Sequence, residues 1–87
     1  MFELDMKMFE DAFESNWAKE SNFLGVLVDI NGLKEVIINS KENYQTKLEY
    51  YKNTYSENLI HKHAPDVKIL DFTFEKNYAN IKANLLD

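Results

Sequence analysis

Residues 23–38 read Phe-Leu-Gly-Val-Leu-Val-Asp-Ile-Asn-Gly-Leu-Lys-Glu-Val-Ile-Ile, two apolar runs on either side of Asn31-Gly32. Asn-Gly between two such runs is the strongest short signal of a β-hairpin, because both residues tolerate positive φ. A two-residue turn sets Ile30 opposite Leu33 and Asp29 opposite Lys34, and the opposite charges of the second pair favour that register. A longer loop over residues 30–35 is the alternative. We therefore predict strands over residues 23–30 and 33–38.

The two predicted strands are apolar on both faces. One face would hold Leu24, Val26, Val28 and Ile30, and the other would hold Phe23, Leu27, Val36 and Ile38. An antiparallel sheet with one face in water alternates apolar and polar residues, and this hairpin does not. We expect it to lie between two layers or to meet a partner.

The segment before the hairpin, residues 2–19, has the period of an amphipathic helix. Its apolar stripe recurs at steps of four, three, four and four, and consists of Phe2, Met6, Phe9, Phe13 and Trp17. A second face is acidic and consists of Glu3, Glu10, Asp11 and Glu14, with Lys7 among them. We predict one continuous helix over residues 2–19.

A second helix is predicted after the hairpin, from residue 39 or 40 to about residue 61 or 62. Asn39 or Ser40 can cap it, and Glu42 has the spacing of a capping box. Its apolar stripe has the same steps as the first and consists of Tyr44, Leu48, Tyr51, Tyr55 and Leu59. Residues 67–74 alternate as a third strand, and a slip in phase between Ile69 and Leu70 predicts a bulge. Residues 77–86 form a weak last helix, with Tyr78, Ile81 and Leu85 on one side.

These elements predict an α+β fold in the order α-β-β-α-β-α. We expect a small three-stranded sheet packed by helices, with residues 23–30 as its central strand, and one domain over residues 1–87. The connection from the second to the third strand would be a crossover if those strands are parallel. A chain of 87 residues builds a small core, which makes a homodimer one expected alternative to a monomer.

Composition excludes several classes of protein. The chain has no Cys, which removes disulfides, thiolate metal sites and Cys nucleophiles and favours a reducing compartment. We expect no signal peptide, no membrane-spanning segment and a cytoplasmic location. The net charge is −5, and residues 1–20 contribute −4 of it through six acids and two lysines. Such a chain repels phosphate backbones, and it has no Arg to bind them, so direct nucleic-acid binding is not expected.

The sequence contains no pattern typical of a catalytic or cofactor site. Gly25 and Gly32 are its only glycines, which rules out a glycine-rich phosphate loop. His61, His63 and Asp66 are the one weak candidate for a metal site, with suitable ligand types but no obvious fourth ligand. A histidine at a helix end and a solvated loop histidine explain that cluster more simply. We expect no enzyme activity, no cofactor and no metal.

Two surface features remain as candidate partner-binding sites. The acidic face of Glu3, Glu10, Asp11 and Glu14 could attract a basic partner or imitate a phosphate track, although a solubilising role explains it more simply. Tyr50 points away from the apolar stripe of its predicted helix, and tyrosine is enriched in binding hot spots.

Residues 35–59, Glu-Val-Ile-Ile-Asn-Ser-Lys-Glu-Asn-Tyr-Gln-Thr-Lys-Leu-Glu-Tyr-Tyr-Lys-Asn-Thr-Tyr-Ser-Glu-Asn-Leu, resemble small uncharacterised proteins of phages and prophages of Gram-positive bacteria. The resemblance implies a phage accessory protein that acts in the host cytoplasm by binding a host protein. Some such proteins inhibit defence nucleases of the CRISPR type. The alternative is a phage structural or assembly component, held by self-association through Met1, Leu4 and Met8. No catalytic residue follows from the resemblance.

Overall fold

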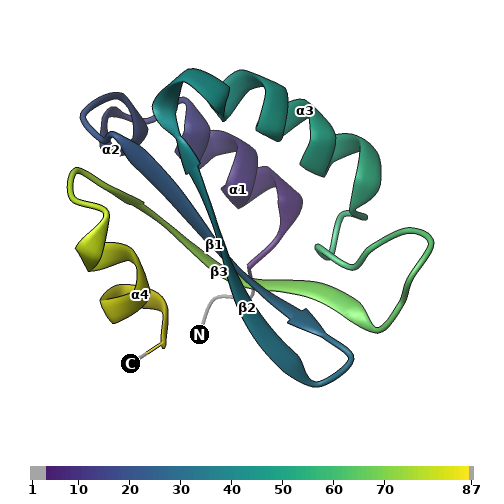
Figure 1. Ribbon diagram of the computed structural model, residues 1–87. Helices are drawn as coiled ribbons and strands as arrows, with labels where there is room; N and C mark the ends of the chain where they lie inside the picture. Colours follow the sequence, from purple (N-terminus) through teal and green to yellow (C-terminus); the bar gives the residue numbers. More distant parts are fainter. Residues whose placement is uncertain (1–3, 87) are drawn as a thin grey trace.

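The computed structural model describes residues 4–86 and confirms the predicted α+β fold (Figure 1). The three strands form one antiparallel sheet in the order β2-β1-β3, so the first strand is central, as predicted. Both outer strands run opposite to β1 and therefore run in the same direction, joined by the crossover through α3. The elements are α1 (Met6–Phe13), α2 (Asn16–Lys19), β1 (Phe23–Ile30), β2 (Leu33–Ser40), a 3₁₀ turn η1 (Lys41–Asn43), α3 (Tyr44–Thr54), β3 (Val67–Glu75) and α4 (Ala79–Leu86).

The hairpin has the predicted two-residue turn. Asn31 has φ of 53° and Gly32 has φ of 90°, and Ile30 lies opposite Leu33 with Asp29 opposite Lys34. The Asp29 carboxylate also accepts a hydrogen bond from the Gly32 N–H at 2.8 Å. The alternative of a longer loop is therefore wrong.

The predicted bulge is present in β3. Leu27 lies opposite Asp71 and Val28 lies opposite Ile69, which leaves Leu70 without a partner on β1. The extra residue reverses the alternation of the strand. As a result Ile69 and Phe72 pack into one core cluster, while Leu70 packs into the other.

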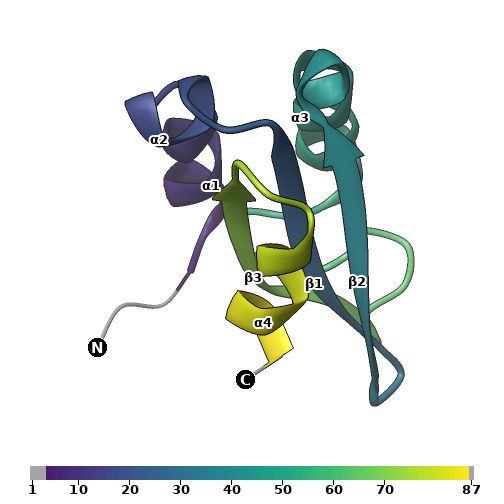
Figure 2. The ribbon, with the colours of Figure 1, turned by 60° about the vertical axis from the view of Figure 1, so that its left-hand side comes forward.

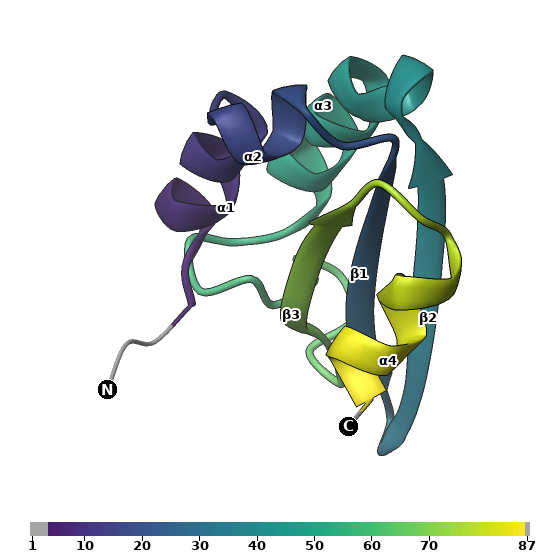
Figure 3. The same cartoon turned by 90° about the vertical axis from the view of Figure 1, so that its left-hand side faces the viewer.

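Helices cover both faces of the sheet, which explains why both faces of the hairpin are apolar. Helices α1 and α3 pack on the face of Leu24, Val26 and Val28, and α4 packs on the opposite face through Ile81 and Leu85 (Figure 2). Figure 3 shows α4 apart from the other three helices. Helix α4 confirms the weak last helix, but Tyr78 lies just outside it and is 58% exposed.

The prediction of one helix over residues 2–19 is wrong. Helix α1 begins at Met6, where Asp5 caps it, and the chain breaks again at Ser15, which has extended backbone angles and caps α2. The Ser15 hydroxyl donates to the Ala12 carbonyl at 2.6 Å and accepts from the Ala18 N–H at 3.4 Å. These bonds replace helical ones, because serine competes for nearby backbone groups. After the break, Trp17 still packs against Phe72 and Phe74 but is 47% exposed. Phe2 lies outside the described residues.

The prediction of a helix reaching residue 61 or 62 is also wrong, because α3 ends at Thr54. Tyr55 is extended and Leu59 has φ of 63°. Ser56 and Ile60 close a turn through two hydrogen bonds. The Ile60 N–H donates to the Ser56 hydroxyl oxygen at 3.3 Å, and the Ser56 N–H donates to the Ile60 carbonyl at 2.8 Å. The predicted capping box of Asn39 and Glu42 is absent too, since Asn39 belongs to β2 and Ser40 makes no side-chain capping bond. Tyr55 and Leu59 are nevertheless buried, through a loop instead of a helix.

Candidate protein-binding surface

The acidic residues of α1 are partly neutralised by lysines. Glu10 lies 3.9 Å from the ammonium of Lys52 on α3, and Asp11 lies 3.8 Å from that of Lys7 on α1. Glu14 ends α1 and is exposed, whereas Glu3 lies outside the described residues. The described part of the predicted acidic face therefore carries less unpaired charge than its sequence indicates.

Tyr50 lies on the outer side of α3, as predicted, and is 46% exposed. The Lys47 ammonium lies 4.9 Å from the centre of its ring, and the Tyr51 ring lies 5.2 Å away. Within residues 4–86, no hydrogen bond, ion pair or ring contact joins Tyr50 to the acidic residues of α1. The structure does not bring these two candidate sites into contact.

The two histidines lie close to each other. Their rings are 6.3 Å apart, and the His63 N–H donates to the Nδ1 atom of His61 at 3.0 Å. His61 lies in a bridge with Tyr55 and not in a last helical turn, which corrects the simpler explanation given for it above. In the part of the chain that is described, no three His, Cys, Asp or Glu residues, Asp66 included, are grouped so that they could hold an ion.

A hollow of about 310 Å³ lies between α2, the end of β3 and the start of α4. Its most exposed aromatic residue is Trp17, which is 47% exposed although the sequence predicts it on the apolar stripe of the first helix. The indole ring lies 5.3 Å from the Phe74 ring and 5.8 Å from the Phe72 ring, so one side of it is supported by the core. The hollow is lined by Trp17, Glu20, Ser21, Phe74, Glu75, Lys76, Asn77 and Asn80.

Hydrogen bonds hold the walls of this hollow in place. The Ser21 hydroxyl is buried, donates to the Ala18 carbonyl at 2.7 Å and lies 2.7 Å from the Tyr44 hydroxyl. One oxygen of Glu75 accepts from Thr73 at 2.5 Å and from Asn84 at 2.6 Å. The one sequence signal near this site is Ser15, a residue type that favours caps, which lies inside the predicted helix and caps α2 two residues before Trp17.

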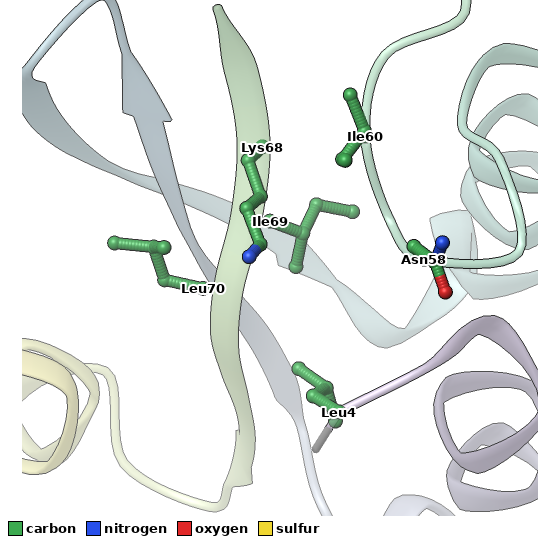
Figure 4. Close-up of a pocket in the computed structure, with 6 residues that line it drawn as sticks. All are labelled: Leu4, Asn58, Ile60, Lys68, Ile69 and Leu70. Atoms are coloured by element: carbon green, nitrogen blue, oxygen red, sulfur yellow. The ribbon is translucent and has the colours of Figure 1, made fainter. Parts of the chain in front are cut away.

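A second hollow, of about 420 Å³, lies beside the first half of β3 (Figure 4). Its lining contains one charged group and one amide among aliphatic side chains, and consists of Leu4, Asn58, Ile60, Lys68, Ile69 and Leu70. The lining offers no carboxylate, imidazole or hydroxyl to act as a base or nucleophile.

The ionisable groups that the fold perturbs are buried tyrosines. Burial raises the pKa of Tyr51, which is 1% exposed, and of Tyr44 and Tyr55. These phenols stay protonated at neutral pH, so the perturbation belongs to core packing and provides no reactive group.

Comparison with known proteins gives no family for this chain. No protein-family model matches it, and neither does any curated protein or solved structure. None of the helices between residues 4 and 86 is both long enough and apolar enough to span a bilayer.

Proposed function

We propose that this chain is a protein-binding module that acts by contact and has no catalytic role. The observation that carries the proposal is Trp17, a large aromatic side chain held half in water by a rigid wall of core rings. Tryptophan is the residue most characteristic of binding hot spots, and exposing it has no benefit for folding. Acidic residues flank it in sequence, with Glu14 at the end of α1 and Glu20 at the end of α2.

The partner that suits this surface is a basic one. The net charge of −5 and the acids of the first segment favour association with a positively charged surface. Together with the resemblance of residues 35–59 to phage proteins, this supports a phage-encoded inhibitor of a host factor, working in the host cytoplasm. We propose a CRISPR-type defence nuclease as the target, with Glu10, Asp11 and Glu14 facing its nucleic-acid channel and Glu3 as a further member of that face.

The test is binding to a purified host nuclease, together with inhibition of its DNA cleavage. The combined variant Glu10→Lys, Asp11→Lys and Glu14→Lys should weaken binding at least about tenfold, because like charges repel across the contact. The matched control, Glu35→Lys, Glu42→Lys and Asp66→Lys, changes the net charge equally at exposed sites elsewhere and should bind as the wild type does. Unchanged affinity of the first variant would exclude phosphate mimicry.

Trp17→Ala tests the module itself. This variant should lose the partner while its circular dichroism stays that of the folded protein, since Trp17 is only half-buried. A folded Trp17→Ala protein that still binds and inhibits would show that the contact surface lies elsewhere.

A structural or assembly component of a phage particle is the second candidate. Within residues 4–86, β2 has no strand on its outer side, and Leu33 at its start is 73% exposed. An open edge strand is a template for pairing with another chain. Met8 is 38% exposed and Leu4 lines a hollow, so both are available for contacts between copies of the chain. Self-association in sedimentation velocity, with no binding to a host nuclease, would favour this candidate.

A further inference from the structure

The hollow beside Trp17 combines aromatic side chains with net negative charge. Two of its lining residues are carboxylates, Glu20 and Glu75, against the single lysine Lys76. Asn77 and Asn80 add amide groups to the rim, and Trp17 and Phe74 supply the aromatic surface. We propose that this hollow receives one arginine side chain of the partner protein, an inference that rests on the proposed function and names what its surface recognises.

The chemistry of the wall selects a cation. The face of an indole ring attracts a cation through its quadrupole more strongly than any other side-chain ring does. A guanidinium is planar, stacks on an aromatic face and keeps its in-plane donors free for carboxylate and amide oxygens, whereas an ammonium is a compact point charge. The Trp17 ring beside Glu20 and the two asparagines suits the first geometry.

Nothing within the described chain already fills this role. The cation–ring contacts among residues 4–86 join Lys47 to Tyr50 and to Tyr51, and none involves Trp17. The sequence contains no arginine at all, so a guanidinium must come from another protein and not from a second copy of this chain.

The size of the hollow also fits a single side chain. Its volume of about 310 Å³ is at the lower end of small-ligand pockets, which span roughly 300–1,000 Å³. Its walls are fixed by the bonds of Ser21 to Tyr44 and of Glu75 to Thr73 and Asn84, so little ordering is needed when the arginine enters.

The test uses N-acetyl-arginine amide as the probe and the fluorescence of Trp17, the only tryptophan of the chain, as the signal. N-acetyl-citrulline amide is the matched control, because its urea group has nearly the same shape and no charge. We expect a saturable change in the millimolar range with arginine and at least about fivefold weaker binding of citrulline. Backbone and side-chain amide signals of Asn77 and Asn80 should shift over the same titration in heteronuclear NMR spectra.

Two variants locate the effect. Glu20→Gln should weaken the arginine probe about two- to fivefold, whereas Glu42→Gln, an exposed site on η1, should leave it unchanged. The inference is overturned if citrulline or N-acetyl-lysine amide binds as well as arginine. It is also overturned if neither fluorescence nor the asparagine signals respond.

The outcome is separable from that of the proposed function. Suppose that Trp17→Ala abolishes binding to the nuclease but the arginine probe has no effect on the wild type. The protein-binding surface at Trp17 is then supported, and the proposal that its hollow receives an arginine is wrong. If both fail, the contact surface itself is misplaced.

Discussion

Gly25 on β1 decides how closely α4 can approach the sheet. A Cβ atom at this position would lie 2.2 Å from the Cγ2 atom of Ile81 and 3.1 Å from the Cδ1 atom of Leu85. The first distance is more than an ångström inside ordinary van der Waals contact, and Ile81 is fully buried, so its side chain has no free space to enter. Gly25→Ala should therefore displace α4.

The expected size follows from overpacking of a filled core, which costs about 1–3 kcal/mol. In the absence of a clash, alanine in a strand would instead stabilise the chain by roughly 0.5–1 kcal/mol relative to glycine. The two expectations have opposite signs. In a domain of this size each kcal/mol changes Tm by roughly 4–8 °C, which is easily measured.

The assay is urea and thermal denaturation followed by far-ultraviolet circular dichroism, with hydrogen exchange of the α4 amides as the local probe. Ile81→Leu supplies the control, because it removes the Cγ2 methyl group at nearly constant volume and alone should cost less than about 1.5 kcal/mol. The double variant Gly25→Ala with Ile81→Leu should be more stable than the sum of the two single changes predicts, by at least about 0.5 kcal/mol. A Gly25→Ala protein as stable as the wild type, or strict additivity in the double variant, would refute the reasoning.

Three further outcomes are expected. Tyr51→Phe removes a buried hydroxyl that has no hydrogen-bond partner, so the free energy of unfolding should change little or rise. Tyr44→Phe removes the 2.7 Å bond to Ser21 and should lower the free energy of unfolding by about 0.5–1.5 kcal/mol. Equal urea midpoints for the two variants would contradict this difference. Burial raises the pKa of Tyr51 above its ordinary value of 10.0. Above pH 10 the folded chain therefore retains a proton that the unfolded chain releases. The contribution of this group to stability is complete below pH 10 and is lost as the pH rises further. Urea titrations on either side of that pH should show a shallower alkaline decline for Tyr51→Phe, and an unchanged slope would contradict the assignment. Asp5→Ala removes the hydrogen bond from the Met8 N–H at 2.8 Å and should destabilise the fold by about 1 kcal/mol. Asp5→Asn can still cap the helix and should keep most of the wild-type stability.

Local signals in the sequence were enough to predict the sheet. The Asn31-Gly32 turn, the register of Asp29 with Lys34 and the bulge beside Leu70 are all as predicted. Each depends on interactions between near neighbours, such as the φ angles that a turn requires or the alternation of a strand. The stripes also identified much of the core correctly, since Met6, Phe9, Tyr44, Tyr51, Tyr55 and Leu59 are buried.

The candidate site could not be predicted in the same way. A stripe at helical spacing shows which residues are apolar, but it does not show where a serine will take the backbone bonds of the helix. Ser15 does this after α1 and Ser56 does it after α3. Trp17 follows the first break and is 47% exposed, and His61 follows the second and lies in a bridge with Tyr55.

The sequence by itself determined the order of elements, the hairpin and its register, because these follow from side-chain periodicity and from the backbone freedom of two adjacent residues. The tertiary structure alone decided where helices stop and which aromatic residues stay in water. Both depend on competition between helical hydrogen bonds, the local bonds of Ser15 and Ser56, and contacts with other elements. The loop after α3 forms backbone bonds to β3, from the His61 N–H to the Val67 carbonyl and from the Ile69 N–H to the Leu59 carbonyl. Trp17 packs against Phe72 and Phe74, which lie more than 50 residues farther along the chain.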